Sequence, residues 1–104
     1  MTAKACYLEG LQKIAAHELD AAVEAFQKAV EADDTFHIGY LGWAQALDRQ
    51  GKVDEAIVQV KKAIEIMPDD ALAHTSLSRL YQQKDMIPEA EAEMAISQRL
   101  SAKG

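Results

Sequence analysis

The chain has 104 residues and a formal net charge of −6 at pH 7, with 49% hydrophobic and 27% charged residues. This composition is typical of a globular protein, and the length suffices for one domain with a modest core. The acidic balance argues against nucleic acid or an anionic membrane as a partner, because both require clustered Lys and Arg.

Each third of the chain predicts two helices separated by a short turn. In the first third the turn falls at His17, where a residue tolerant of left-handed backbone geometry is needed. In the middle third a helix ends before Gly51, a second begins near Asp54, and Pro68 stops it. In the last third Asp85 occupies the place of the glycine, and Pro88 falls near the start of the final helix.

The second helices repeat one another at an offset of 34 residues. Residues 20–31 (DAAVEAFQKAVE) align without a gap with residues 54–65 (DEAIVQVKKAIE). A further step of 34 reaches Ala90, Met94 and Leu100, at the places of Ala56, Val60 and Ile66. The chain therefore divides into units at about 3–36, 37–70 and 71–104.

The pattern resembles that of the tetratricopeptide repeat family, whose unit is a 34-residue helix–turn–helix. In the middle unit the residues on signature places are Tyr40, Trp43, Ala44, Leu47, Gly51, Ala56, Val60, Ala63 and Pro68. The resemblance implies an all-α, right-handed superhelical solenoid of three antiparallel helix–turn–helix repeats, six helices in total. We expect residues 1–104 to form a single domain of this kind.

Both end units carry polar residues where the middle unit is apolar. Glu9 and Lys13 stand at the places of Trp43 and Leu47, as expected for an array end that lacks a neighbour. At the other end the polar substitutions are Glu91, Ser97 and Gln98. These changes predict a complete three-unit domain rather than a fragment of a longer array.

No residue pattern indicates catalysis or a cofactor. The sequence has no glycine-rich phosphate loop and no paired-cysteine or His-Glu-x-x-His metal motif. His17, His37 and His74 lie far apart in sequence, and His74 falls at a packing position. We expect no enzyme activity, metal site or cofactor. We interpret the acidic pairs 33–34 and 69–70 as caps of helix N-termini.

One cysteine, Cys6, excludes an internal disulfide, and we expect it to be a small buried side chain. The N-terminal residues have no apolar run of secretory-signal length, and no segment approaches the length of a membrane span. These features predict a location in the reducing cytoplasm and no insertion into a membrane.

The resemblance implies that the first helix of each unit lines a concave, partner-binding groove. The residues expected in that groove are Lys4, Tyr7, Leu11, Ile38, Leu41, Gln45, Asp48, Arg49, Leu72, Thr75, Arg79 and Gln82. Their apolar members would form one patch with polar residues at its side, a composition typical of protein interfaces. Alternatively, neighbouring first helices could cover much of this surface.

The leading functional hypothesis is a scaffold that binds a peptide or helix of a partner protein in this groove. The alternative is self-assembly into a homodimer or larger oligomer through the groove or the array ends. Some family members bind chaperone tails through a basic two-carboxylate clamp. The residues at the matching places are Tyr7, Leu11, Gly42, Leu72 and Ser76, so we expect no such clamp here.

Overall fold

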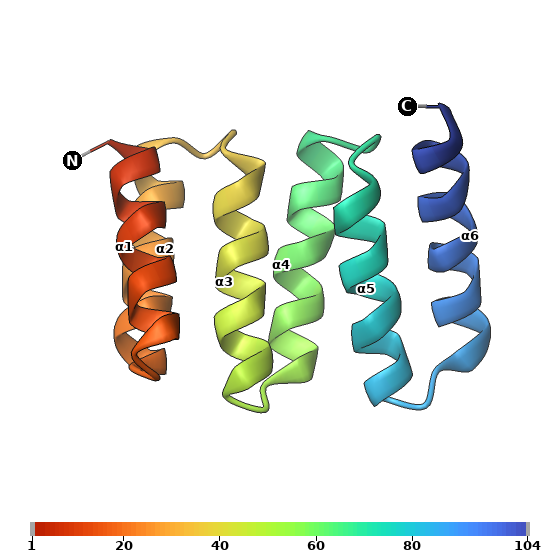
Figure 1. Cartoon of the computed structure of the whole chain (residues 1–104), viewed down its shortest axis with the longest axis horizontal. Helices are drawn as coiled ribbons and strands as arrows, with labels where there is room; N and C mark the ends of the chain where they lie inside the picture. Colours follow the sequence, from red (N-terminus) through yellow and green to blue (C-terminus); the bar gives the residue numbers. More distant parts are fainter. Residues whose placement is uncertain (1, 104) are drawn as a thin grey trace.

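Six helices joined by short turns make up residues 2–103, which are the residues that the computed structural model describes. Their bounds are α1 Ala3–Ala15, α2 Leu19–Ala32, α3 His37–Arg49, α4 Val53–Ile66, α5 Ala71–Gln83 and α6 Ile87–Lys103. Consecutive helices run antiparallel and pack side by side in chain order (Figure 1). The six predicted helices are therefore confirmed, and no strand occurs within residues 2–103.

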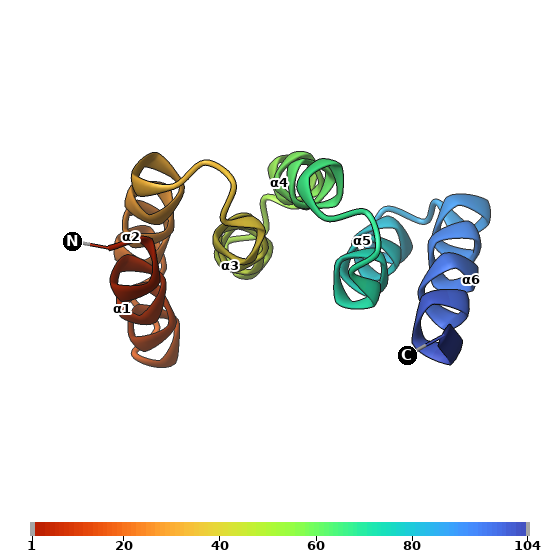
Figure 2. The same ribbon diagram turned by 90° about the horizontal axis from the view of Figure 1, so that it is seen from above.

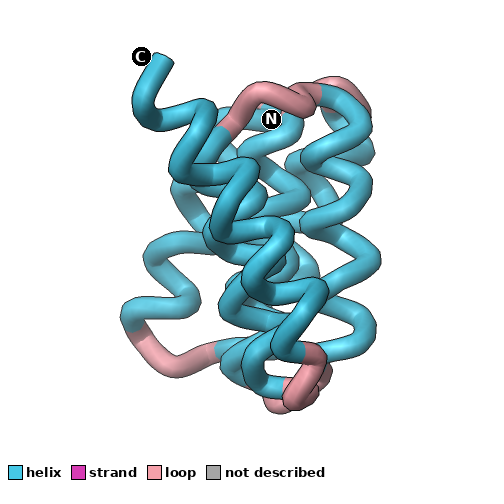
Figure 3. The backbone as a smooth tube through the Cα atoms, turned by 90° about the vertical axis from the view of Figure 1, so that its right-hand side faces the viewer, coloured by secondary structure: helices cyan, strands magenta, loops and turns pink. Residues whose placement is uncertain are grey.

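The helices form two layers. Seen from above, α1, α3 and α5 lie on one side of the array, whereas α2 and α4 lie on the other, and α6 follows α5 at the far end (Figure 2). The end view shows that the connecting turns gather at the two tips of the helices (Figure 3). Within the described residues, no helix has the length and sustained hydropathy that a bilayer span requires.

The turn inside each repeat has the same left-handed conformation. His17 has φ 61°, Gly51 has φ 80° and Asp85 has φ 60°, and these three residues are 34 positions apart. In the middle repeat the Lys52 N–H then donates to the Leu47 carbonyl at 2.9 Å, and equivalent bonds follow the other two turns. This closure satisfies the last carbonyl groups of the preceding helix, and it confirms the predicted turn positions.

The acidic pairs between repeats differ from one another. Asp70 is the N-cap of α5, and its Oδ1 accepts a hydrogen bond from the Leu72 N–H at 3.1 Å, as predicted. Asp33 instead ends α2, and its Oδ1 accepts from the Thr35 N–H at 3.0 Å and the Thr35 hydroxyl at 2.7 Å. The interpretation of Asp33 as the cap of a helix N-terminus was therefore wrong, because its carboxylate closes the turn itself and α3 starts without a side-chain cap.

The core of the first two repeats is centred on Phe26, whose side chain is fully buried. A Cβ placed on Gly10 of α1 would lie 2.6 Å from the Phe26 ring, and one on Gly42 of α3 would lie 2.4 Å from it. The ring therefore fits only because positions 10 and 42 have no side chain. It sets how closely α1 and α3 approach α2.

The last repeat is held by polar side chains that are buried. The Ser78 hydroxyl donates to the Ala90 carbonyl at 2.7 Å, and the Ser97 and Thr75 hydroxyls lie 2.6 Å apart. Ser97 is only 5% exposed, so its predicted role on a polar outer face was wrong. A hydroxyl is accepted at this packing position because Thr75 and the Ala71 carbonyl satisfy it. Glu91 and Gln98 are exposed.

His74 and Cys6 are both buried, as the sequence predicted. The two ring nitrogens of His74 lie 2.8 Å from Glu93 Oε1 and 2.9 Å from the Pro68 carbonyl oxygen. These contacts join α5 to α6 and to the turn before α5, so His74 has a structural role. No cluster of three or more His, Cys, Asp or Glu side chains suited to a metal ion occurs within the described part of the chain.

Candidate binding groove

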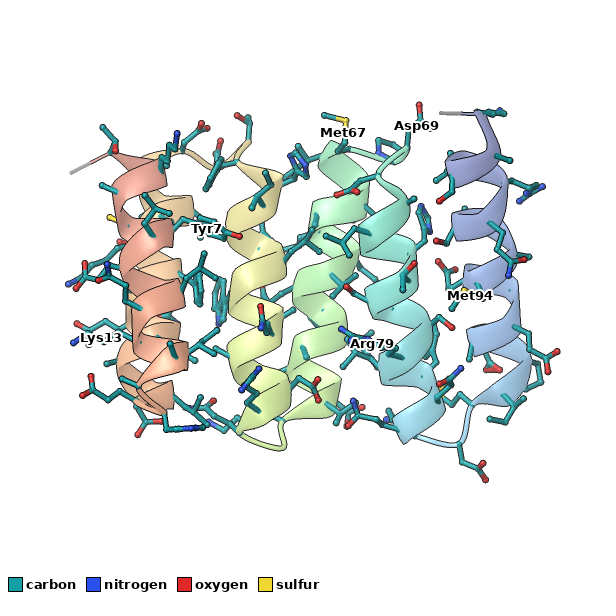
Figure 4. All side chains as sticks on the ribbon, viewed as in Figure 1. Tyr7, Lys13, Met67, Asp69, Arg79 and Met94 are labelled. Carbon is teal, nitrogen blue, oxygen red and sulfur yellow. The ribbon has the colours of Figure 1, made fainter. Side chains whose placement is uncertain are left out.

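A groove of about 770 Å³ runs between α3 and α5, with α4 behind it and Tyr7 of α1 at its edge. It is lined by Tyr7, His37, Ile38, Leu41, Gly42, Ala44, Gln45, Asp48, Val60, Met67, Asp69, Asp70, Leu72, Ser76, Arg79 and Leu80. Figure 4 looks onto this face and shows Tyr7 between α1 and α3, with Met67 and Asp69 around the turn from α4 to α5. The volume is within the range of protein sites that bind small molecules or side chains of a partner.

Seven of the twelve residues expected in the groove line it: Tyr7, Ile38, Leu41, Gln45, Asp48, Leu72 and Arg79. The other five do not: Lys4, Leu11, Arg49, Thr75 and Gln82.

Two of these five have clear contacts elsewhere. The Thr75 hydroxyl donates to the Ala71 carbonyl of its own helix and lies 2.6 Å from the Ser97 hydroxyl of α6. Leu11 packs against the core cluster around Phe26. Both side chains are partly buried by these contacts.

Exposed aliphatic side chains gather at one end of the groove. Leu72 is 65% exposed, Met67 43% and Ile38 39%, and these are half of the six large hydrophobic residues that are exposed within residues 2–103. Several exposed apolar side chains in one concave site indicate an interaction surface, whereas scattered ones need no explanation. Met67 was not among the residues expected in the groove, and it extends there because α4 ends just before Pro68.

Tyr7 is held in place at the groove edge by two other aromatic rings. Its ring centroid lies 5.7 Å from that of Phe26, at a tilt of 55°, and 5.7 Å from that of Phe36, nearly perpendicular to it. Edge-on and tilted contacts of this kind are favourable for aromatic pairs. Tyr7 is therefore a rigid wall of the groove rather than a freely moving side chain.

The charged groups of the groove are mostly acidic. Asp69 and Asp70 lie in the turn before α5, beside Met67, and Asp70 Oδ2 lies 3.7 Å from His37 Nε2. Asp48 lies on α3 near the other end and accepts a hydrogen bond from Gln83 at 2.9 Å. Arg79 is the one arginine in the lining, and no ion pair joins it to another residue within 2–103. His37, Asp69 and Asp70 were not among the residues expected in the groove.

A second cleft, of about 420 Å³, lies between α2 and α4 on the opposite layer. Trp43 and the half-exposed Val58 line it beside the amides of Gln50 and Gln59, whose Oε1 atoms are buried without a hydrogen-bond partner among the described residues. This cleft is smaller than the groove and has only one exposed aliphatic side chain, so the groove is the stronger candidate site.

Of the five positions that correspond to a chaperone-tail clamp, four line the groove: Tyr7, Gly42, Leu72 and Ser76. None of these side chains carries a positive charge that could pair with a carboxylate. The expectation that this chain does not hold a chaperone tail in that manner stays a prediction.

The sequence profile of the tetratricopeptide repeat matches residues 13–80. A crystal structure of MamA is similar at 26% identity and a TM-score of 0.93, over 98% of this chain and 60% of that one. The chain thus spans less than two thirds of the MamA chain. A comparison with curated proteins finds no match.

Two more distant structures share the fold. The Yersinia enterocolitica type III secretion chaperone SycD, in complex with a peptide of the translocator YopD, is 18% identical with a TM-score of 0.88, over 93% of this chain and 74% of that one. The first repeat domain of Spaghetti (RPAP3), bound to an HSP90 peptide, is 17% identical with a TM-score of 0.92, over 98% and 81% of the two chains.

Proposed function

The chain belongs to the tetratricopeptide repeat family, and we propose that it is a scaffold that binds a segment of a partner protein in the groove between α3 and α5. The observation that supports this proposal most is the exposure of Ile38, Met67 and Leu72 together in that groove. A partner that covers these side chains removes apolar surface from water, which is the main driving force of most protein association.

The solved complexes provide independent support for a peptide as the occupant. SycD was crystallised with a YopD peptide, and RPAP3 is bound to an HSP90 peptide, on the same helical architecture. Their sequence identities to this chain are 18% and 17%, so they support the mode of binding but not the identity of the partner.

The test uses Leu72→Ser, because a side chain that is 65% exposed contributes little to the core. Leu8→Ser is the matched control, since Leu8 is 48% exposed on α1 and lies outside the groove. Peptides selected from a random library on the wild-type protein are titrated into each variant by calorimetry. We expect Leu72→Ser to weaken binding roughly tenfold, from about 1.5 kcal/mol of lost burial, and Leu8→Ser to leave it unchanged. Equal binding by the two variants would rule out the groove as the site.

The second candidate function is self-assembly through the same exposed residues. A further SycD structure, 19% identical, is described as an alternative dimer, so this architecture can associate with itself. Light scattering after size exclusion separates the two functions. A dimer that dissociates on Leu72→Ser supports self-assembly, and a monomer at every accessible concentration removes it.

The remaining expectations form part of the same proposal. Residues 1–104 act as one domain of three repeats, about 3–36, 37–70 and 71–104, without enzyme activity of their own. A cytoplasmic location is supported by the single cysteine, which leaves no internal disulfide to form.

A further inference from the structure

We propose that the occupant of the groove is an amphipathic segment with a positive charge, whose Lys or Arg meets the Asp69–Asp70 end while its apolar side chains cover Met67 and Leu72. This inference rests on the proposed function, since it describes the chemistry of the segment that the groove binds. It depends on how charge is distributed along the groove.

The carboxylates of Asp69 and Asp70 stand beside the most exposed apolar side chains. Asp69 is exposed, and no hydrogen bond or ion pair joins its side chain to another described residue. Asp70 uses Oδ1 to cap α5 and Oδ2 to approach His37 at 3.7 Å. Because each carboxylate oxygen can accept more than one hydrogen bond, both groups can still accept from a cation.

The opposite end of the groove has no comparable excess of charge. There the carboxylate of Asp48 is offset by the guanidinium of Arg79, which lies on α5 two turns after Leu72. The three lining aspartates and one lining arginine make the groove acidic as a whole, with the excess at the Asp69–Asp70 end. An acidic segment that covered Met67 and Leu72 would therefore be repelled by the carboxylates of Asp69 and Asp70.

Charge also argues against a second copy of the chain as the occupant. Each copy carries a formal net charge of −6, so two copies repel one another at neutral pH. A cationic segment is attracted by the same field, and electrostatic complementarity of this kind increases the association rate and sets specificity. The structure thus favours a basic partner over self-association.

The experiment starts with a display library of random twelve-residue peptides, selected on the wild-type protein at low salt. We expect the enriched peptides to combine aliphatic residues with a net positive charge, and their affinity to fall as salt rises. Enriched peptides that are neutral or acidic on average would overturn the inference.

The enriched peptides are then titrated into the double variant Asp69→Asn/Asp70→Asn. Asparagine at position 70 keeps the ability to cap α5, so the fold is maintained while two charges are removed. The matched control is Asp33→Asn/Asp34→Asn, which changes the net charge equally at the other repeat junction, outside the groove. We expect about a five- to tenfold loss of affinity in the first variant and little change in the control.

The outcomes separate the two proposals. If Leu72→Ser weakens binding but the two aspartate variants bind equally well, the groove is the site and the proposed charge preference of its occupant is wrong. If no peptide is enriched, or if Leu72→Ser has no effect, the groove itself is refuted and the charge inference fails with it.

Discussion

Replacement of Gly42 by alanine tests whether the Phe26 ring sets the spacing of the helices that form the groove. A Cβ at position 42 would lie 2.4, 2.8 and 2.9 Å from three carbon atoms of that ring. The ring is fully buried, and a Cβ at Gly10 on the other side would lie 2.6 Å from it. The ring therefore has no free space into which it could move, and α3 must shift away from α2.

The expected magnitude follows from two opposing effects. An added methyl group in a packed core costs about 1–3 kcal/mol, and the rigid surroundings of Phe26 favour the upper part of that range. Alanine is better than glycine in a helix interior by about 1 kcal/mol. We therefore expect Gly42→Ala to lower the free energy of unfolding by about 2 kcal/mol, which is about 10 °C in the melting temperature of a domain of this size.

Thermal and urea unfolding, followed by circular dichroism, measure this change in Gly42→Ala, Phe26→Leu and the double variant. Leucine at position 26 leaves room for the new methyl group, so the double variant should be more stable than the sum of the single effects predicts, by about 1 kcal/mol or more. Additive effects, or a Gly42→Ala variant as stable as the wild type, would show that the ring does not constrain α3.

Two further predictions concern the turns. His17→Gly should raise the melting temperature by a few degrees. His17 has φ 61°, a left-handed conformation that strains a residue with a side chain, whereas glycine adopts it without strain, as Gly51 does at φ 80°. A binding titration of this variant should show unchanged affinity. Two hydrogen bonds from Thr35 lower the pKa of Asp33, and the bond from the hydroxyl contributes more than the bond from the backbone N–H. The interaction therefore stabilises the fold at neutral pH, and this stabilisation is lost as the pH falls through the lowered pKa. Thr35→Ala should return the pKa of Asp33 part of the way to its ordinary value, as measured by NMR titration, and no change would contradict the role of the hydroxyl.

The fold could be predicted because the spacing of 34 residues reflects a repeated physical requirement. His17, Gly51 and Asp85 share no side-chain chemistry, yet all three adopt the left-handed conformation that ends a helix. Small residues recur in the same way where paired helices approach closely, as at Gly10 and Ser78. Requirements of this kind are local, so they are visible in the order of residues along the chain.

The groove could be predicted only in part, because it depends on how separate elements meet. The first helices alone were expected to line it, and seven of the twelve residues expected there do so. Met67, Asp69 and Asp70 lie in the turn between repeats, and their position depends on where α4 ends and how α5 is capped. Thr75 was assigned to the groove by its spacing, but its hydrogen bond with Ser97 directs it to α6, a contact that spacing does not reveal.

Side-chain bonds join the repeats at both tips of the helices. At the tip where the turns inside each repeat lie, Gln50 donates to Asp20, Gln83 to Asp48 and Lys84 to Asp54. The first and third of these pairs are related by the same offset of 34 residues.

At the opposite tip, the exposed residues Met67 and Asp69 lie in the turn between repeats (Figure 4), and the exposed Leu72 lies in the first turn of α5. The repeats are joined at this tip too, since the Tyr40 hydroxyl donates to the Asp34 carbonyl at 3.4 Å and a His74 ring nitrogen lies 2.9 Å from the Pro68 carbonyl oxygen. Because the side chains of Met67, Asp69 and Leu72 are exposed and form none of these bonds, they can change to suit a partner while the array remains folded.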